Sequence, residues 1–188
     1  MTLETQPTAP HLEERVAALD HILSGLNLPG GRLTEVALQR IVIAVAGRPE
    51  LFDDLVVADP AHRWWLTLRE ADNFDLRVLS WEHDQTSDWH DHGGSAGAYV
   101  VTRGSLRERF RAADGVTVSE RVAGAGKPVA FEPAHVHDVT YASGSPAVSI
   151  HAYSPPLSGL TYYDHGPLGF VAREVVPEES RRAFELAR

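Results

Sequence analysis

The hydrophobic residues in the first third of the chain recur every three or four positions. This period matches one face of an α-helix, and it predicts helices over residues 12–26, 34–47 and 49–55. Thr34 suits the start of the second helix, because its hydroxyl can accept a hydrogen bond from a backbone N–H of the first turn. Pro49 suits the start of the third, because a proline at the first helical position forfeits no hydrogen bond.

After Pro60 the hydrophobic pattern changes to the alternation that is typical of β-strands. The segments that follow this alternation are residues 64–68, 74–81, 98–102, 105–111, 116–121, 128–131, 136–141, 147–153 and 170–176. Gly104 is spaced to turn a hairpin between the third and fourth segments, and the turn around Gly144 separates the seventh from the eighth. Many short strands without a repeat predict a mainly β fold, a single antiparallel barrel or jelly roll.

The organisation of the domain follows from these segments. Residues 1–11 show no periodicity, so we expect a mobile arm there. Residues 12–188 are expected to form one domain, with helices over 12–56, the barrel over about 62–176 and a short C-terminal helix over 177–188. A chain of 188 residues is long enough to bury one full core.

The composition narrows the classes of partner. A formal net charge of -9 argues against nucleic acid or an anionic membrane surface as a partner. The chain has no cysteine, which excludes disulfides and thiolate ligands. The first residues do not have the pattern of a signal peptide, and no apolar run reaches the ~18 residues of a membrane span. We therefore expect a cytoplasmic protein, a monomer or weak homo-oligomer, that binds neither nucleic acid nor membrane.

Histidine pairs carry the first chemical signal. His90 and His92 are two residues apart, a spacing that directs both side chains to one face of a strand. A second pair, His135 and His137, follows about forty residues later, and either member could complete a set of three neutral ligands. Such a set leaves coordination positions open, as catalytic metal sites do. The sequence therefore predicts a metal site.

The histidine pattern, with Gly104 between the pairs and Pro133 before the second, resembles the two-motif signature of a cupin barrel. A more specific resemblance, over roughly residues 64–160, is to the cysteine dioxygenase family of cupins. It is carried by three runs: His90-Asp91-His92, Val136-His137-Asp138-Val139 and Pro146-Ala147-Val148-Ser149-Ile150-His151-Ala152-Tyr153-Ser154-Pro155-Pro156-Leu157.

This resemblance implies an Fe(II) site that adds both atoms of dioxygen to a small-molecule thiol and gives a sulfinic acid. The metal ligands it implies are His90, His92 and His137, which leaves His135 at the rim. It also implies a hydrogen-bonded relay beside the iron, made of Ser149, His151 and Tyr153. The spacing of the relay agrees, because residues two apart on a strand share a face.

The chain departs from the family pattern at two positions. The cysteine that crosslinks to the relay tyrosine in many members is replaced by Gly97, so the crosslink cannot form. The arginine that binds the substrate carboxylate in the family would fall near Leu66, where the sequence has no basic residue. Arg69, Arg77 and Arg173 are the candidates to replace it, and we favour Arg173. The absence of an arginine near Leu66 indicates that the substrate is a mercapto acid other than cysteine.

Two other functions fit the metal site. A cupin of this size could be an isomerase or hydrolase that uses another divalent metal, such as zinc or manganese, to activate water. It could also be a metal-binding cupin without catalytic activity. The fold alone does not decide among these functions.

Overall fold

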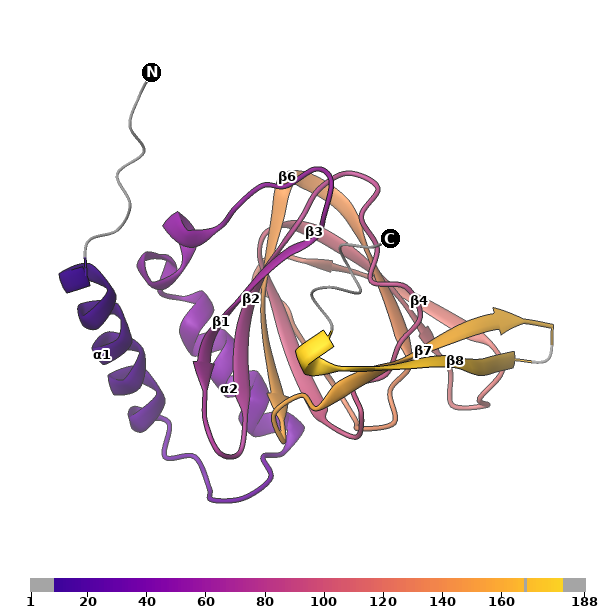
Figure 1. Ribbon diagram of the computed structural model, residues 1–188, viewed down its shortest axis with the longest axis horizontal. Helices are drawn as coiled ribbons and strands as arrows, with labels where there is room; N and C mark the ends of the chain where they lie inside the picture. Colours follow the sequence, from indigo (N-terminus) through magenta and orange to yellow (C-terminus); the bar gives the residue numbers. More distant parts are fainter. Residues whose placement is uncertain (1–8, 168, 181–188) are drawn as a thin grey trace.

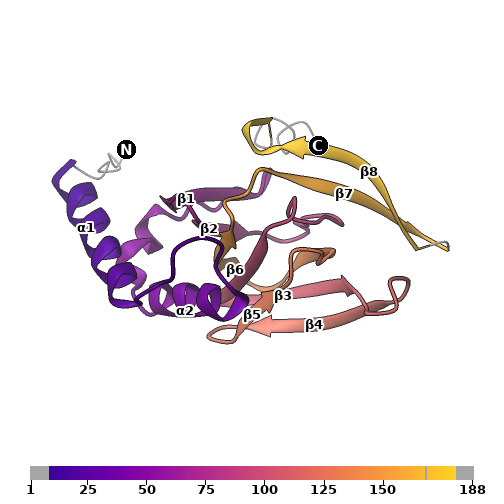
Figure 2. The same cartoon turned by 90° about the horizontal axis from the view of Figure 1, so that it is seen from below.

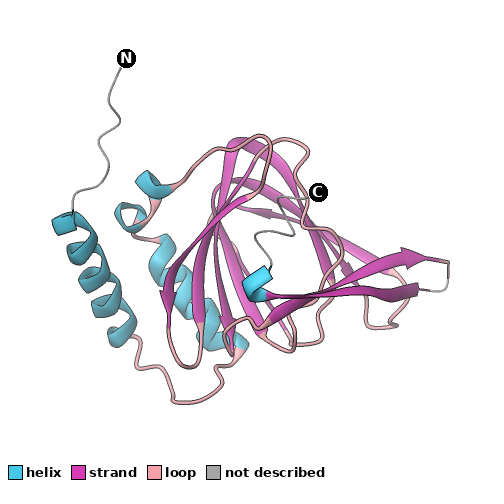
Figure 3. Cartoon of the chain, in the orientation of Figure 1, coloured by secondary structure: helices cyan, strands magenta, loops and turns pink. Residues whose placement is uncertain are grey.

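The computed structural model describes residues 9–167 and 169–180 and places the helices beside a β-barrel (Figures 1 and 3). The helical elements are α1 (Ala9–Gly25), α2 (Glu35–Ala46) and the 3-10 turns η1 (Pro49–Leu51) and η2 (Asp53–Leu55). The strands are β1 (Trp64–Glu70), β2 (Asp75–Trp81), β3 (Ala96–Arg111), β4 (Val118–Gly124), β5 (Pro128–Phe131), β6 (His137–Ser154), β7 (Gly159–Gly166) and β8 (Gly169–Pro177).

The strands form one large sheet and one two-stranded ribbon. In the large sheet the order is β1-β2-β6-β3-β4, with β5 also paired to β3, and β7 pairs with β8. Every pairing is antiparallel. Figure 2 shows the β7–β8 ribbon across the barrel from β3 and β4. Isolated bridges from His90 to His137 and Tyr162 connect the two sides. The predicted fold class, a mainly β cupin domain with N-terminal helices, is confirmed.

The large sheet buries a different core on each face, because successive side chains of a strand point in opposite directions. Val148, Ile150 and Ala152 of β6 lie in the core that α1 and α2 cover. Tyr153 lies in the second core, inside the barrel. The strand period thus places the alternate residues of β6 inside the barrel, where the candidate site lies.

The starts predicted at Thr34 and Pro49 are confirmed. Thr34 is the N-cap of α2, and its side chain accepts a hydrogen bond from the backbone N–H of Ala37 at 3.3 Å. Pro49 begins η1, but the predicted third helix is two separate 3-10 turns rather than one helix. Among the described residues, no helix has both the length and the apolar character needed to cross a bilayer.

The predicted turns at Gly104 and Gly144 are wrong, because β3 and β6 each continue through their glycine. Both glycines have positive φ, +74° and +85°, and they lie where the β3–β6 register shifts. A Cβ on Gly104 would lie 2.3 Å from the carbonyl oxygen of Ser143. The glycines therefore form bulges that let two long strands approach closely, which is the other common use of glycine in a strand.

Other predicted elements and boundaries also differ, and β4, for example, is Val118–Gly124 rather than 116–121. β7 was not predicted, and the segment around His90 and His92 is not a regular strand but a loop with a bridge at His90. α1 begins at Ala9, inside the predicted arm, while residues 1–8 lie outside the described residues. β8 extends to Pro177; residues 178–180 are helical, and the rest of the predicted C-terminal helix lies outside the described residues.

Candidate metal centre

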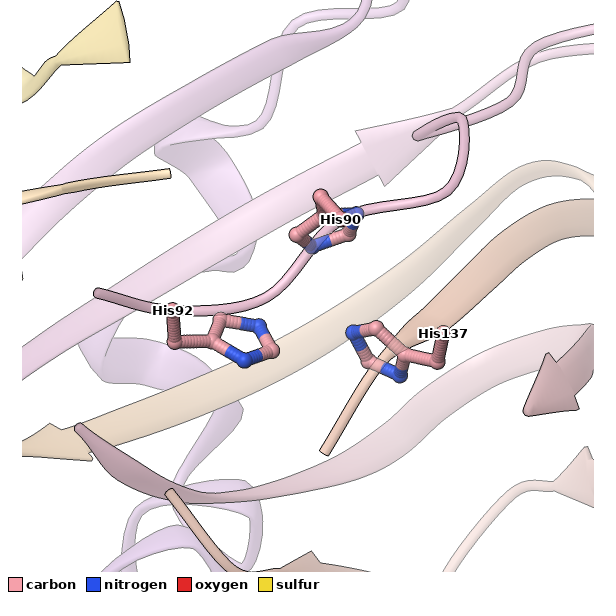
Figure 4. Close-up of side chains that lie close together, drawn as sticks. All are labelled: His90, His92 and His137. Carbon is pink, nitrogen blue, oxygen red and sulfur yellow. The ribbon is translucent and has the colours of Figure 1, made fainter. Parts of the chain in front are cut away.

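Three buried histidines meet inside the barrel. His90 and His92 come from the loop before β3, and His137 is the first residue of β6. One ring nitrogen from each lies within 4.8 Å of the others, and Figure 4 shows the three rings turned toward a common space. The backbone holds this arrangement, because His90 and His137 exchange two hydrogen bonds, at 2.9 and 3.0 Å.

Hydrogen bonds determine which nitrogen of two of these rings is available to a metal. The Nδ1 of His90 is 2.8 Å from the carbonyl oxygen of Asp88. The Nδ1 of His137 is 2.8 Å from Oε1 of Glu108. A carbonyl or an ionised carboxylate can only accept, so both Nδ1 atoms carry the proton. On each ring Nε2 is therefore the nitrogen without a proton, which is the form in which a histidine nitrogen binds a cation.

His92 provides the test of whether these residues fit a metal. Both of its ring nitrogens are buried and have no hydrogen-bond partner among the described residues. Its ring lies between Phe131 and Tyr153, with centroid distances of 4.7 and 5.1 Å. Burial, and then the repulsion that His90 and His137 exert whenever they are protonated, hold the pKa of His92 well below its ordinary value and favour the neutral imidazole. A buried polar atom without a partner costs ~1–3 kcal/mol, and a cation among the three rings would supply that partner.

Glu108 of β3 is a residue of the site that the sequence analysis missed. Its side chain is 0% exposed and accepts hydrogen bonds from His135 and His137 at 2.9 and 2.8 Å. His135 is thus directed at this carboxylate rather than at the three-histidine cluster. Burial alone would raise the pKa of Glu108, but hydrogen bonds from His135, His137 and Arg121 outweigh it and hold the pKa below its ordinary value.

The predicted relay residues form a continuous chain of hydrogen bonds on the inner face of β6. Ser149 Oγ is 2.8 Å from His151 Nε2, and His151 Nδ1 is 3.1 Å from the hydroxyl of Tyr153. The indole N–H of Trp81 donates to Ser149 at 2.9 Å, which extends the chain by one residue that the sequence did not indicate. Tyr153 and His151 line the same small cavity as the three histidines.

That cavity has a volume of about 30 Å³, room for one or two water molecules. Apolar residues form much of its wall, among them Leu79 of β2, Leu157 of the loop after β6 and Leu160 of β7. Arg63 is the one arginine among the described residues that line it. Its guanidinium lies over the ring of Trp81, 5.1 Å from the centroid, and its Nη1 donates to the carbonyl of Thr86 at 3.0 Å.

The structure places the three predicted substrate arginines away from this cavity. Arg69 lies 3.3 Å from Asp20 of α1, on the helical side of the sheet. Arg77 is buried, but it pairs with Asp75 and Glu178. Arg173 lies 3.3 Å from Asp164 on the β7–β8 ribbon, and its side chain is 39% exposed. The sequence analysis missed Arg63, although this arginine stands directly before β1. Nothing in the sequence shows that its side chain lines the cavity inside the barrel.

Comparison with solved structures gives distant likenesses of the fold. A protein from Thermus thermophilus has 18% identity and a TM-score of 0.49, over 55% of this chain and 93% of its own. An oxalate oxidase has 14% identity and a TM-score of 0.48, over 56% of this chain and 57% of its own. An uncharacterized conserved protein with a double-stranded β-helix domain from Klebsiella pneumoniae has 17% identity and a TM-score of 0.46, over 65% and 93%. These scores carry no argument on function, and no curated protein matched the chain.

The family comparison covers most of the chain. The model of the family described as cysteine dioxygenase type I matches residues 32–166. This span contains the three histidines, Glu108, the relay from Ser149 to Tyr153, and Arg63. The chain therefore belongs to the cysteine dioxygenase type I family.

Proposed function

We propose that this protein is an Fe(II)-dependent dioxygenase that oxidises a small thiol to a sulfinic acid. The observation that carries the proposal is that three buried imidazoles and the tyrosine of a buried relay line one small cavity. The reaction balances without another reductant: R–SH and O₂ give R–SO₂H, in which sulfur loses four electrons and both oxygen atoms accept them. Ferrous iron, when bound, supplies dioxygen activation and lowers the pKa of a bound thiol.

The protein's own part begins with the histidines. His90, His92 and His137 would hold the cation through neutral nitrogen donors, which would leave it its full charge for binding a thiol. The hydrogen bonds of His90 to Asp88 and of His137 to Glu108 hold the rings in position, and the apolar wall around them excludes bulk water. His92 has no such hydrogen bond and is held instead by stacking on Phe131 and Tyr153.

Tyr153 has the second role. Its hydroxyl is held by His151, which Ser149 and the indole of Trp81 hold in turn. A phenol fixed in this way can donate one hydrogen bond to a reacting group in the cavity, or keep its proton while the substrate binds. Because the crosslinking cysteine is replaced by Gly97, hydrogen bonds and ring contacts, rather than a covalent bond, hold the phenol.

Arg63 has the third role, at the end of the substrate away from sulfur. It lines the inner cavity and also an outer pocket of about 360 Å³ that shares Ser87 with it. The inner cavity is too small for a thiol acid as it stands, so Arg63 must move to admit one. A guanidinium at this position can then bind a carboxylate. Arg63 replaces Arg69 and Arg173 as the proposed carboxylate-binding residue. Cysteine was set aside as the substrate because no arginine was found near Leu66, and with Arg63 in that role this reason no longer holds. The substrate class becomes a small thiol with a carboxylate, cysteine included.

Oxygen consumption by iron-loaded protein tests the proposal. We expect uptake only with a thiol present, and a sulfinic acid that carries two labelled atoms when ¹⁸O₂ is used. The panel would compare cysteine, 3-mercaptopropionate and cysteamine. Turnover of a substrate by zinc- or manganese-loaded protein without oxygen would indicate an isomerase or hydrolase instead. Tight metal binding with no thiol oxidised would indicate a metal-binding cupin without this activity.

A further inference from the structure

One buried carboxylate lies at the centre of the polar residues behind the metal centre. Glu108 accepts four hydrogen bonds, and its two oxygens have about four acceptor positions, so its capacity is filled. His135 and His137 bond to Oε1 at 2.9 and 2.8 Å, while Tyr99 and Arg121 bond to Oε2 at 2.6 and 2.7 Å.

The surroundings of Glu108 favour its charged form. A buried carboxylate is costly unless it is paired and hydrogen-bonded, and Arg121 supplies the opposite charge at 2.7 Å. In that form it has no proton to give. His137 must therefore be the donor in the bond between them, and its Nε2 keeps the lone pair that a cation needs. A carboxylate behind a ligand histidine also raises the basicity of the ligand.

The second oxygen of Glu108 leads to the relay. Tyr99 donates its hydroxyl to Oε2, and the Tyr99 ring stacks on the His151 ring with a centroid distance of 5.2 Å and an interplanar angle of 16°. Tyr99 is fully buried, so the ring cannot turn aside into solvent. Glu108 thus helps to position His151 indirectly, because it holds the Tyr99 ring that stacks on the His151 ring.

We propose that Glu108 is the positioning residue of this site: it fixes the proton of His137 on Nδ1, so that Nε2 binds the metal, and it holds Tyr99 against the relay histidine. The inference rests on the proposed three-histidine metal centre. It goes beyond that function because it assigns metal affinity and relay geometry to a side chain that touches neither metal nor substrate.

The chain contains a matched control. Asp138 is also a buried carboxylate and follows His137 directly, but its hydrogen-bond partners are Arg109 and the hydroxyl of Thr86 rather than a histidine. Asp138→Asn and Glu108→Gln each replace a buried charge by an amide of the same shape. Loss of a charge from the core is common to both variants, whereas loss of a carboxylate behind a ligand belongs to Glu108→Gln alone.

The test is an anaerobic titration of Fe(II) against a chelator for the parent and both variants. We expect Glu108→Gln to bind Fe(II) ~10–100-fold more weakly and Asp138→Asn to bind it within about 2-fold of the parent. Equal affinities for Glu108→Gln and the parent would overturn the inference. Neither result depends on turnover, so a failure of the thiol dioxygenase proposal would be recognised separately, from the oxygen-uptake panel.

A second measurement needs no variant and covers the case in which Glu108→Gln does not fold. Long-range ¹H–¹⁵N spectra of the metal-free parent report which ring nitrogen of His137 carries the proton. We expect the Nδ1–H tautomer alone. A mixture of tautomers, or Nε2–H, would overturn the inference regardless of how the variant behaves.

Discussion

Arg63 is the residue through which the cavity would meet a charged substrate. Replacing it by methionine keeps an unbranched apolar stem but removes the guanidinium and its charged hydrogen bonds, which are worth ~1.5–3 kcal/mol. This free energy corresponds to a ~10–100-fold change in an equilibrium constant, so we expect the KM for 3-mercaptopropionate to rise by that factor. The KM for cysteamine, which has no carboxylate, should change about 2-fold or less. Steady-state oxygen uptake measures both.

Arg173→Met is the control for Arg63, since Arg173 pairs with Asp164 away from the cavity. Its kinetics should match those of the parent. If Arg63→Met impairs the acidic and the neutral thiol equally, Arg63 supports the wall of the cavity through Trp81 rather than binding a carboxylate.

Tyr153 offers a test of the relay at the same scale. Tyr153→Phe keeps the ring that stacks on His92, so iron content and melting temperature should stay near those of the parent. Loss of the hydroxyl should lower kcat by ~10²-fold, the usual contribution of a positioned donor or acid. Metal analysis and oxygen uptake on the same preparation separate the two effects. If Tyr153→Phe turns over at the rate of the parent, the Tyr153 hydroxyl takes no part in the reaction.

The sequence indicated the histidines more readily than the residues around them, for a physical reason. Two histidines two apart are rare enough to be noticed, and the relay shares one strand face. Glu108, in contrast, stands between Arg107 and Arg109 and has the pattern of an exposed charged strand. Only the pairing of β3 with β6 shows that this glutamate lies inside the barrel behind His137.

At the scale of elements, the hydrophobic alternation predicted strand faces better than strand ends. The face of β6 that bears Ser149, His151 and Tyr153 was correctly inferred, because alternation is a local property. Whether a glycine turns the chain or forms a bulge depends on the partner strand, which lies far away in sequence. β3 and β6 were therefore divided at Gly104 and Gly144, where the structure has bulges.

Gly97 of β3 tests how closely the elements pack around the metal centre. A Cβ there would lie 2.2 Å from Cζ of Phe131, the β5 residue that stacks on His92. Gly97→Ala must displace this ring, so we expect a loss of ~1–3 kcal/mol in the free energy of unfolding and weaker metal binding. Denaturant unfolding and Fe(II) titration would measure the two losses.

Gly124 of β4 is the matched control for Gly97. It is also a strand glycine, but a Cβ there would meet no atom within 4 Å. Gly124→Ala should change the free energy of unfolding by about 0.5 kcal/mol or less. Combining Gly97→Ala with Phe131→Leu should recover part of the lost stability. A Gly97→Ala variant as stable as the parent would show that Phe131 can move without cost.

At the scale of the whole molecule, two effects of pH on stability oppose one another. The chain carries a formal net charge of -9, and lowering the pH toward its pI of about 5.5 reduces its self-repulsion. His92 acts in the other direction. Its pKa is lowered in the folded protein by burial and by the neighbouring histidines, so without metal the folded state keeps it neutral while the unfolded state takes up a proton below pH ~6.5.

The sign follows from proton linkage: where the unfolded state binds more protons, stability falls as the pH falls. The contribution of His92 is therefore complete above pH ~6.5 and is lost progressively as the pH falls below that value. His92→Phe keeps a ring between Phe131 and Tyr153 but cannot titrate. For metal-free protein, we expect the difference in free energy of unfolding between His92→Phe and the parent to be level above pH 6.5. Below that pH the difference should grow, with the variant the more stable of the two.

His83→Phe is the control, because it changes an exposed histidine, 80% of whose side chain is accessible. Its stability should follow that of the parent at every pH. Parallel curves for His92→Phe and the parent from pH 7 to pH 5 would mean that His92 takes up a proton in the folded state, and that water reaches the centre of the three histidines when no metal is bound.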